Sequence, residues 1–180
     1  MLPLKEAINV KHKQAERMPF NSRMFRGLLS KNEYLLYLNQ QLKIFQTIES
    51  IGLPHVSLKR TENVQADIDE LKTQGYYSDS VLISTHLYAN YLSSLSYEQV
   101  LPHVYLNYMA IAFGGQMIKK VVPSTGRMYV FDNMQEAIQS IRNVQNDGWA
   151  EEVNKGFDFN ILILEELETQ CSNEQLLSKQ

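Results

Sequence analysis

The sequence predicts an all-α fold, a single-domain helical bundle. Apolar residues recur at spacings of three and four along most of the 180 residues, which is the period of a helix that packs on one face. Runs that alternate apolar with polar residues, the pattern of a half-buried strand, are missing. The chain contains no internal repeat and no linker, and its length suits one domain with a sizeable core. These observations favour helix-on-helix packing.

The N-terminal half predicts four helices. The spacing of apolar residues predicts the first helix over residues 3–17. Ser30 and Glu33 have the spacing of a capping box, in which each side chain bonds the backbone of the other residue, so a long helix is expected to begin there. Two shorter helices are predicted over residues 63–75 and 80–95.

The C-terminal half predicts three helices and one irregular segment. Ser96 and Gln99 form a second capping box, which opens a helix that contains the adjacent glycines Gly114 and Gly115. The turn residues of the segment 122–133 predict the one long irregular stretch. Further helices are expected at 134–145 and 148–169, within a domain that spans 1–170, and a polar tail over 171–180 is expected to fray.

The charge of the chain is unevenly distributed. The net charge is −3, yet the first 31 residues carry seven basic and two acidic side chains. A basic N-terminal face could attract an acidic protein partner or an anionic ligand, although a solvated surface explains the same charges equally well. No segment resembles a nucleic-acid-binding motif, so nucleic acid is not an expected partner.

The single cysteine, the charged N-terminus and the uncharged segment 99–118 indicate where in the cell the protein is expected. The single cysteine, Cys171, excludes an internal disulfide framework and indicates a reducing compartment. Charged side chains interrupt the first 13 residues, so no signal peptide is recognised and a cytoplasmic location is expected. Residues 99–118 lack charge over a length that raises the question of a membrane span. Pro102, His103 and the glycine pair suit lipid poorly, so a buried helix beside a ligand is favoured.

The adjacent glycines in "MAIAFGGQMIKK", residues 109–120, are unusual for a helix. Each glycine in a helix interior costs about 1 kcal/mol relative to alanine. Their presence indicates that something approaches the backbone more closely than a Cβ atom allows. Gly114 and Gly115 could admit a ligand, or they could allow close packing of another part of the protein.

Most familiar catalytic motifs are missing, which leaves chemistry based on a single histidine. The sequence has no Glu-x-x-His pair, phosphate-binding glycine loop or Cys-x-x-Cys, and its four histidines lack zinc spacing. His12 shares one stripe of its predicted helix with Lys5, Ala15 and Glu16. A heme site uses such a set: an imidazole for iron, a carboxylate for the other ring nitrogen and a cation for a propionate. On these residues alone, a surface histidine in a basic helix remains the favoured interpretation.

Two segments resemble the heme oxygenases. "LKEAINVKHKQAE", residues 4–16, resembles the opening helix of that family, and "HVYLNYMAIAFGGQMIKK", residues 103–120, resembles its distal helix. The resemblance implies that His12 is the proximal iron ligand, that Glu16 holds its other ring nitrogen and that Lys5 binds a propionate. It also implies that the backbone at Gly114 and Gly115 lies against the distal face of the heme.

The resemblance also implies an activity. Heme b would be both cofactor and substrate of an oxidoreductase that converts it to biliverdin, carbon monoxide and ferrous iron with O2 and external electrons. No flavin or nicotinamide motif is present, so the electron donor is expected to be a separate acidic protein such as a ferredoxin. A thiaminase-like hydrolase of the same fold is a second alternative, but it would need a pocket cysteine, and Cys171 is badly placed.

The distal helix departs from the family pattern. Ala110 and Ile111 occupy the positions where the family has glycine and an aspartate that anchors a proton-supplying water network. Asn107 stands in place of a familiar arginine. An enzyme with an altered network, served by Asn107 or Tyr105, is the favoured interpretation, and a non-catalytic heme-binding or heme-carrier protein is the alternative.

The candidate site residues fall into two groups. The candidate catalytic residues are Gly114, Gly115, Asn107 and Tyr105, although core packing explains Tyr105 equally well. The candidate heme-binding residues are Lys5, His12, Glu16, Tyr105, Ala110, Ile111, Gly114 and Lys155, the last being the one cation near the place on the final helix where the family binds propionates.

Overall fold

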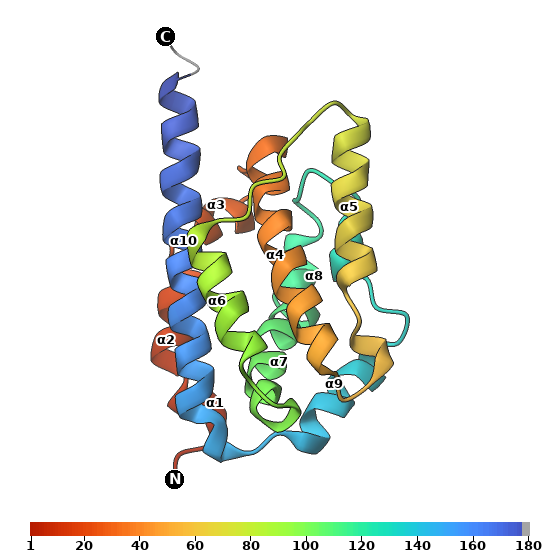
Figure 1. Cartoon of the computed structure of the whole chain (residues 1–180), viewed down its shortest axis with the longest axis vertical. Helices are drawn as coiled ribbons and strands as arrows, with labels where there is room; N and C mark the ends of the chain where they lie inside the picture. The colour runs from red at the N-terminus through yellow and green to blue at the C-terminus, as the bar shows by residue number, and fades with distance from the viewer. Residues whose placement is uncertain (178–180) are drawn as a thin grey trace.

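Every regular element of the described chain is helical, as the sequence predicts (Figure 1). The computed structural model describes the backbone of residues 1–177 and the side chains of residues 1–173. The α-helices are α1 (Leu4–Ala7), α2 (Asn9–Glu16), α3 (Pro19–Phe25), α4 (Lys31–Ile51), α5 (Thr61–Thr73), α6 (Ile83–Ser93), α7 (Tyr97–Ala112), α8 (Gly115–Ile118), α9 (Met134–Val144) and α10 (Ala150–Leu177). Three short 3-10 turns are Val56–Leu58, Arg127–Tyr129 and Asp147–Trp149.

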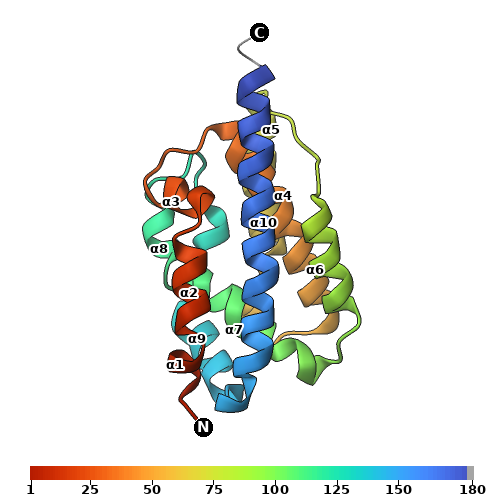
Figure 2. The same ribbon diagram turned by 90° about the vertical axis from the view of Figure 1, so that its left-hand side faces the viewer.

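The long helix α10 organises the bundle. It packs against α2, α3, α6 and α7, and α2 and α6 flank it on opposite sides (Figure 2). The main core lies among α4, α5, α6 and α7 and includes large buried rings such as Tyr88 and Tyr108. A second, smaller apolar cluster holds α1 and α2 against α7 and α10; its buried members are Leu4, Ile8, Ala15, Leu106, Val153, Phe157 and Ile161.

Both predicted capping boxes are confirmed. Ser30 Oγ accepts from the backbone N–H of Glu33 at 3.2 Å, and the Glu33 carboxylate accepts from the backbone of Ser30 at 2.7 Å. The same reciprocal pair joins Ser96 and Gln99 at the start of α7. Each pair satisfies backbone donors that the first turn of a helix leaves without partners.

Several boundaries differ from the sequence-based prediction, and the helix that was expected to contain Gly114 and Gly115 ends before them, at Ala112. The first helix divides into α1 and α2 at Ile8, which keeps a right-handed helical conformation, so the chain hardly changes direction. The helix α3 was missed, although Pro19 at its first position is a typical start signal. The helix α10 continues to Leu177, past the expected end at residue 169, and Cys171 on it is buried. Residues 178–180 of the expected tail lie outside the described part of the chain.

The uncharged segment 99–118 forms most of the buried helix α7 and the short, partly exposed helix α8. Ten residues of α7 are buried, among them Ile111 and Asn107. Among residues 1–177, no helix combines the length and the apolar character that crossing a bilayer requires.

Candidate functional site

His12 lies on α2 with its side chain about half exposed. Its ring packs edge-on against Phe157 of α10, with ring centroids 5.9 Å apart and an interplanar angle of 71°. Its Nε2 lies 3.5 Å from Glu16 Oε1, and the two side chains are 52% and 51% exposed. Ile8 and Ala15, on the same side of the helix, are buried in the smaller cluster. Burial of these apolar neighbours anchors α2 on α10 and leaves the imidazole and the carboxylate accessible together.

An open recess of about 320 Å³ adjoins this pair. It is lined by Glu16 from α2 and by Ser22, Phe25 and Arg26 at α3. Phe25 also reaches the distal helix, because a Cβ atom placed on Gly114 would lie 3.9 Å from Phe25 Cζ. Phe25 therefore connects the carboxylate of α2 with the glycine pair.

The helix that carries the glycines breaks at them. The helix α7 ends at Ala112, Phe113 caps it, and α8 begins at Gly115. Exposed apolar side chains surround the break, namely those of Ala110, Phe113 and Met117. An accessible apolar surface of this kind is typical of a ligand-binding wall.

The two glycines have different surroundings. A Cβ atom on Gly114 would meet the Ala110 carbonyl oxygen at 3.4 Å, an ordinary van der Waals contact. A Cβ atom on Gly115 would lie 2.5 Å from Tyr129 Cδ1, closer than real Cβ atoms approach. Gly115 is therefore required by packing of the Tyr129 ring. Packing imposes no such requirement on Gly114.

Tyr129 is held in place by polar contacts to the irregular segment 122–133. The buried carboxylate of Asp67 accepts from the backbone of Arg127 and Met128, at 3.0 and 2.9 Å. The buried guanidinium of Arg60 donates to the carbonyls of Met128 and Val130. These bonds fix the chain on either side of Tyr129, so the ring cannot easily withdraw from Gly115.

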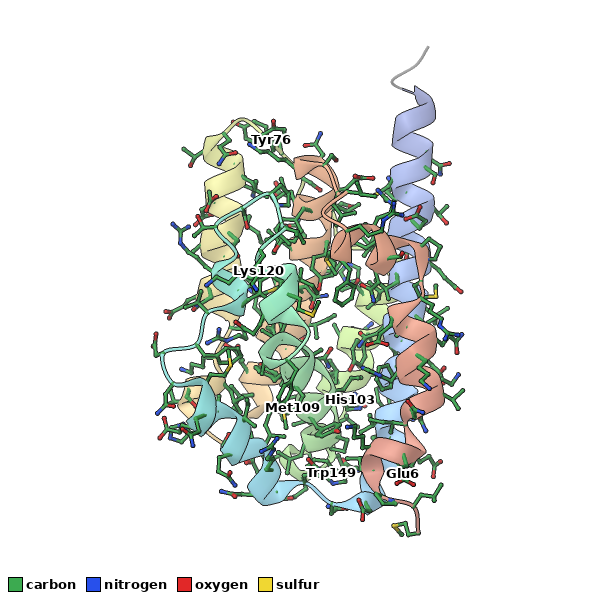
Figure 3. All side chains as sticks on the ribbon, turned by 180° about the vertical axis from the view of Figure 1, so that it is seen from behind. Glu6, Tyr76, His103, Met109, Lys120 and Trp149 are labelled. Atoms are coloured by element: carbon green, nitrogen blue, oxygen red, sulfur yellow. The ribbon has the colours of Figure 1, made fainter. Side chains whose placement is uncertain are left out.

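A line of polar side chains connects α6, α7 and α10. His103 is fully buried on α7, next to α10 (Figure 3). Its Nε2 is 3.0 Å from Glu152 Oε1, and its Nδ1 is 2.8 Å from the Tyr88 hydroxyl. Asn107 donates to the same hydroxyl at 3.1 Å and accepts from Asn160 at 3.4 Å.

Ionisation within this line follows from burial and hydrogen bonding. Burial lowers the pKa of His103, a loss that the bond to Glu152 only partly offsets, so the imidazole is neutral at pH 7. Burial opposes the charge on Glu152, yet hydrogen bonds from Tyr91 and His103 keep the pKa of this carboxyl below its ordinary value. Burial also raises the pKa of Tyr88, which stays protonated.

The remaining candidate site residues have surroundings that differ from one another. Ile111 is buried in the main core, and Lys5 is exposed on α1. Tyr105 is half-buried and packs edge-on against Trp149, with ring centroids 6.5 Å apart, and burial raises its pKa.

Lys155 lies against α6. Its Nζ is 2.9 Å from the Tyr91 hydroxyl and 4.2 Å from the centre of that ring. Two residues along a helix turn through about 200°, so Lys155 and Phe157 are on nearly opposite sides of α10. The structure thus brings Phe157, and not Lys155, to His12, and binding of a propionate by Lys155 stays a prediction.

Several residues of this region were not identified from the sequence. Phe25 and Phe157 read as ordinary apolar positions, and Tyr88 and Glu152 lie on helices that carry no motif. Their proximity to the site depends on how α3, α6 and α10 pack around α7, which a local pattern does not encode.

Comparison with known proteins identifies the family. The model of the family described as heme oxygenase matches residues 2–147. The chain is 26% identical over 155 residues to heme oxygenase 1, chloroplastic, of Oryza sativa subsp. japonica, covering 75% of this chain and 54% of the relative. The chain thus spans about half of that protein's length.

Solved structures give the same fold. Heme oxygenase-1 from the cyanobacterium Synechocystis sp. PCC6803, in complex with heme, aligns with a TM-score of 0.74 at 17% identity over 98% of this chain and 97% of that one. Heme oxygenase from Leptospira interrogans aligns with a TM-score of 0.77 at 21% identity, covering 91% and 97% of the two chains. Heme oxygenase-2 from Synechocystis, in complex with heme and NO, gives 0.79 at 18% identity, covering 98% and 91%. With a family model that matches most of its length, this chain belongs to the heme oxygenase family.

Proposed function

We propose that this chain is a heme-degrading enzyme that binds heme b through His12. It would use O2 and electrons from a separate donor to open the ring, yielding biliverdin, carbon monoxide and ferrous iron. Family membership supports the proposal. The observation that carries it is the accessible His12–Glu16 pair, which Phe25 connects with Gly114.

The residues beside His12 and at the glycine break fit heme, a flat apolar ring with two carboxylates on one edge. The exposed side chains of Phe25, Phe113 and Met117 offer apolar contact. Lys5 on α1 and Arg26, directly after α3, are exposed cations. Bound heme would supply the iron that activates oxygen and the ring that is oxidised.

The chain's own residues have distinct roles in this proposal. His12 would ligate iron through one ring nitrogen, and Glu16 would hold the other and so set the ring orientation. Gly114 leaves the distal face open because it has no side chain. Phe25, Phe113 and Met117 exclude bulk water from the reacting ring. The single cysteine fits a reducing compartment such as the cytoplasm.

An acidic electron donor such as a ferredoxin would dock on α2. Two cations of the basic N-terminal region are already paired, Lys11 with Asp158 and Arg23 with two glutamates. Lys13 and Arg17 remain exposed beside an open recess of about 490 Å³. These two charges are the ones we expect to attract the donor.

Replacement of His12 tests heme ligation. Hemin added to the wild-type protein is expected to give a Soret spectrum typical of histidine ligation, and His12→Ala is expected to lose it. His55→Ala is a matched control, because His55 is also a surface histidine beside a carboxylate, with Nε2 3.7 Å from Glu136. A spectrum that survives His12→Ala contradicts the proposal.

A non-catalytic heme-binding protein is the second candidate. Ile111 favours it, because this buried apolar side chain occupies the position of the family's aspartate and cannot hold water. The fate of bound heme under reductant and oxygen distinguishes the two functions: an enzyme consumes it, and a carrier keeps it.

A further inference from the structure

A continuous line of hydrogen bonds runs from the protein surface to the neighbourhood of His12. Its members in order are Glu152, His103, Tyr88, Asn107 and Asn160, joined at 3.0, 2.8, 3.1 and 3.4 Å. Glu152 is 31% exposed, whereas His103 and Tyr88 are fully buried. The line therefore crosses the packed layer between α6, α7 and α10.

The inner end of the line lies at the candidate heme site. Asn160 is half-buried on α10, one turn after Phe157, whose ring contacts His12. Asn107 precedes Ala110 by one turn of α7, so the two share one face of that helix. The amide of Asn107 thus borders the wall that contains the exposed Ala110.

Close packing keeps His103 between its partners. A Cβ atom on Gly156 of α10 would lie 3.0 Å from His103 Nδ1 and 2.5 Å from Leu106 Cδ2. Only a residue without a side chain lets α10 approach α7 this closely. Gly156 lies in the interior of α10, where glycine disfavours a helix, at the point where α10 covers the His103 imidazole.

The protonation states of these groups determine which of them donates and which accepts in each hydrogen bond of the line. Ionised Glu152 can only accept, so the single ring hydrogen of neutral His103 lies on Nε2. The ring Nδ1 then accepts from the Tyr88 hydroxyl, whose oxygen accepts from the Asn107 Nδ2. The amide oxygen of Asn107 is thereby turned toward Asn160, so a carboxylate three side chains away favours this orientation.

We propose that Glu152, His103 and Tyr88 are positioning residues that hold the Asn107 amide oxygen as a fixed acceptor at the distal side of the heme site. This role rests on the proposed function. It gives the distal helix an oriented polar group near the position where Ile111 supplies none. Asn107 also donates to the His103 carbonyl at 2.8 Å, which strengthens the same orientation.

Protonation of His103 reverses the line. With hydrogens on both nitrogens, Nδ1 would donate to Tyr88, and the hydroxyl would have to turn its own hydrogen away from His103 toward Asn107, where it competes with the amide hydrogen that Asn107 now donates. The other groups that face His103 are the Tyr91 ring and the Lys155 ammonium, whose charge also disfavours the cation. The native orientation is therefore expected at pH 7 and is lost only at a pH below the ordinary histidine pKa of about 6.5.

The line is tested first in the heme-free protein. Nitrogen-15 NMR is expected to find His103 as the neutral Nε2–H form at pH 7.5. In Tyr88→Phe, exchange of the Asn107 side-chain amide protons is expected to rise about tenfold, as for loss of one hydrogen bond. Tyr108→Phe is the matched control, because it removes another buried tyrosine hydroxyl, which lies on α7 and donates to Glu49 outside the line. Unchanged exchange in Tyr88→Phe overturns the inference.

The second measurement uses the heme complex. The stretching frequency of carbon monoxide on ferrous heme reports nearby dipoles, so Tyr88→Phe and His103→Leu should shift it and Tyr108→Phe should not. In the wild type the frequency should change as pH falls below 6.5, and in His103→Leu this change should vanish. Equal frequencies in all variants, with normal heme binding, overturn the inference and leave the proposed function intact. Failure of the wild type to bind heme overturns the proposed function, and with it the role of this line at the heme.

Discussion

Tyr129 packs its ring so closely on Gly115 that a Cβ atom at position 115 would lie 2.5 Å from Tyr129 Cδ1. The next glycine, Gly114, has only ordinary contacts around the same point. Gly115 is therefore required by packing in the core, whereas Gly114 adjoins Phe25, a residue that lines the recess beside Glu16. This difference makes separate predictions for the two positions.

Alanine substitutions at positions 114 and 115 should change the free energy of unfolding differently. Gly115→Ala is expected to lower the free energy of unfolding by about 1–3 kcal/mol, the usual cost of overpacking a core. Gly114→Ala is expected to leave it unchanged or raise it by up to about 1 kcal/mol, because alanine favours the helix. Urea denaturation of both heme-free variants provides the measurement. Equal losses at the two positions would show that packing requires both glycines.

A large side chain at position 114 should affect ligand binding more than folding. Gly114→Leu is expected to fold, because a Cβ atom there would make only ordinary contacts and the neighbouring Phe25 is partly exposed, yet to weaken carbon monoxide binding to the ferrous heme complex at least tenfold. Thermal unfolding of the heme-free variant is the control. Normal carbon monoxide affinity in a heme complex of Gly114→Leu would mean that Gly114 does not face the ligand.

Reversal of charge on α2 should slow the electron donor. Lys13→Glu combined with Arg17→Glu is expected to reduce ferredoxin-driven turnover about tenfold or more at low salt, while heme affinity stays nearly constant. The difference from wild type should shrink as salt rises, because ions screen exposed charges. Lys43→Glu on α4 combined with Lys59→Glu in the loop before α5 changes the net charge equally, outside α2. If this control slows turnover as much, the effect depends on net charge and not on a docking face.

The ion pair between Arg23 and Glu33 should make stability depend on pH. Burial disfavours the charge of Glu33, but hydrogen bonds from the Ser30 backbone and Arg23 bring the pKa of its carboxyl below the ordinary 4.5. Ionised Glu33 therefore stabilises the fold above pH 4.5, and the contribution is lost as pH falls through the lower pKa of the folded state.

Substitution by glutamine isolates that charge. Glu33→Gln keeps the capping box, as Gln99 does at the start of α7, but removes the charge beside Arg23. It is expected to cost about 2 kcal/mol of unfolding free energy at pH 7 and much less at pH 3. A cost that stays constant between these pH values would show that the charge contributes little.

The fold was predictable where the signals are local. The two capping boxes, the helical periodicity and the all-α class depend on residues a few positions apart. The same holds for the His12 stripe, whose spacing along α2 places Glu16 beside the imidazole. The helix α3 was missed because its seven residues are too few for a periodic pattern.

The rest of the site depends on contacts that are distant in sequence. The requirement for glycine at position 115 comes from Tyr129, which is placed by Asp67 and Arg60 on another part of the chain. Similarly, the orientation of Asn107 depends on Tyr88 and on a carboxylate of α10. A sequence pattern identifies such residues one at a time and does not state which of them meet.

The fate of bound heme under reductant and oxygen tests the central claim most directly. The heme complex is mixed with ferredoxin, its reductase and NADPH in air, with catalase present to remove free peroxide, and the absorption spectrum is followed. We expect the Soret band to disappear while biliverdin absorbance rises, with His12→Ala inactive and His55→Ala active. A Soret band that persists through repeated reduction and oxygenation, without biliverdin, would contradict the proposed enzyme and leave a heme-binding protein.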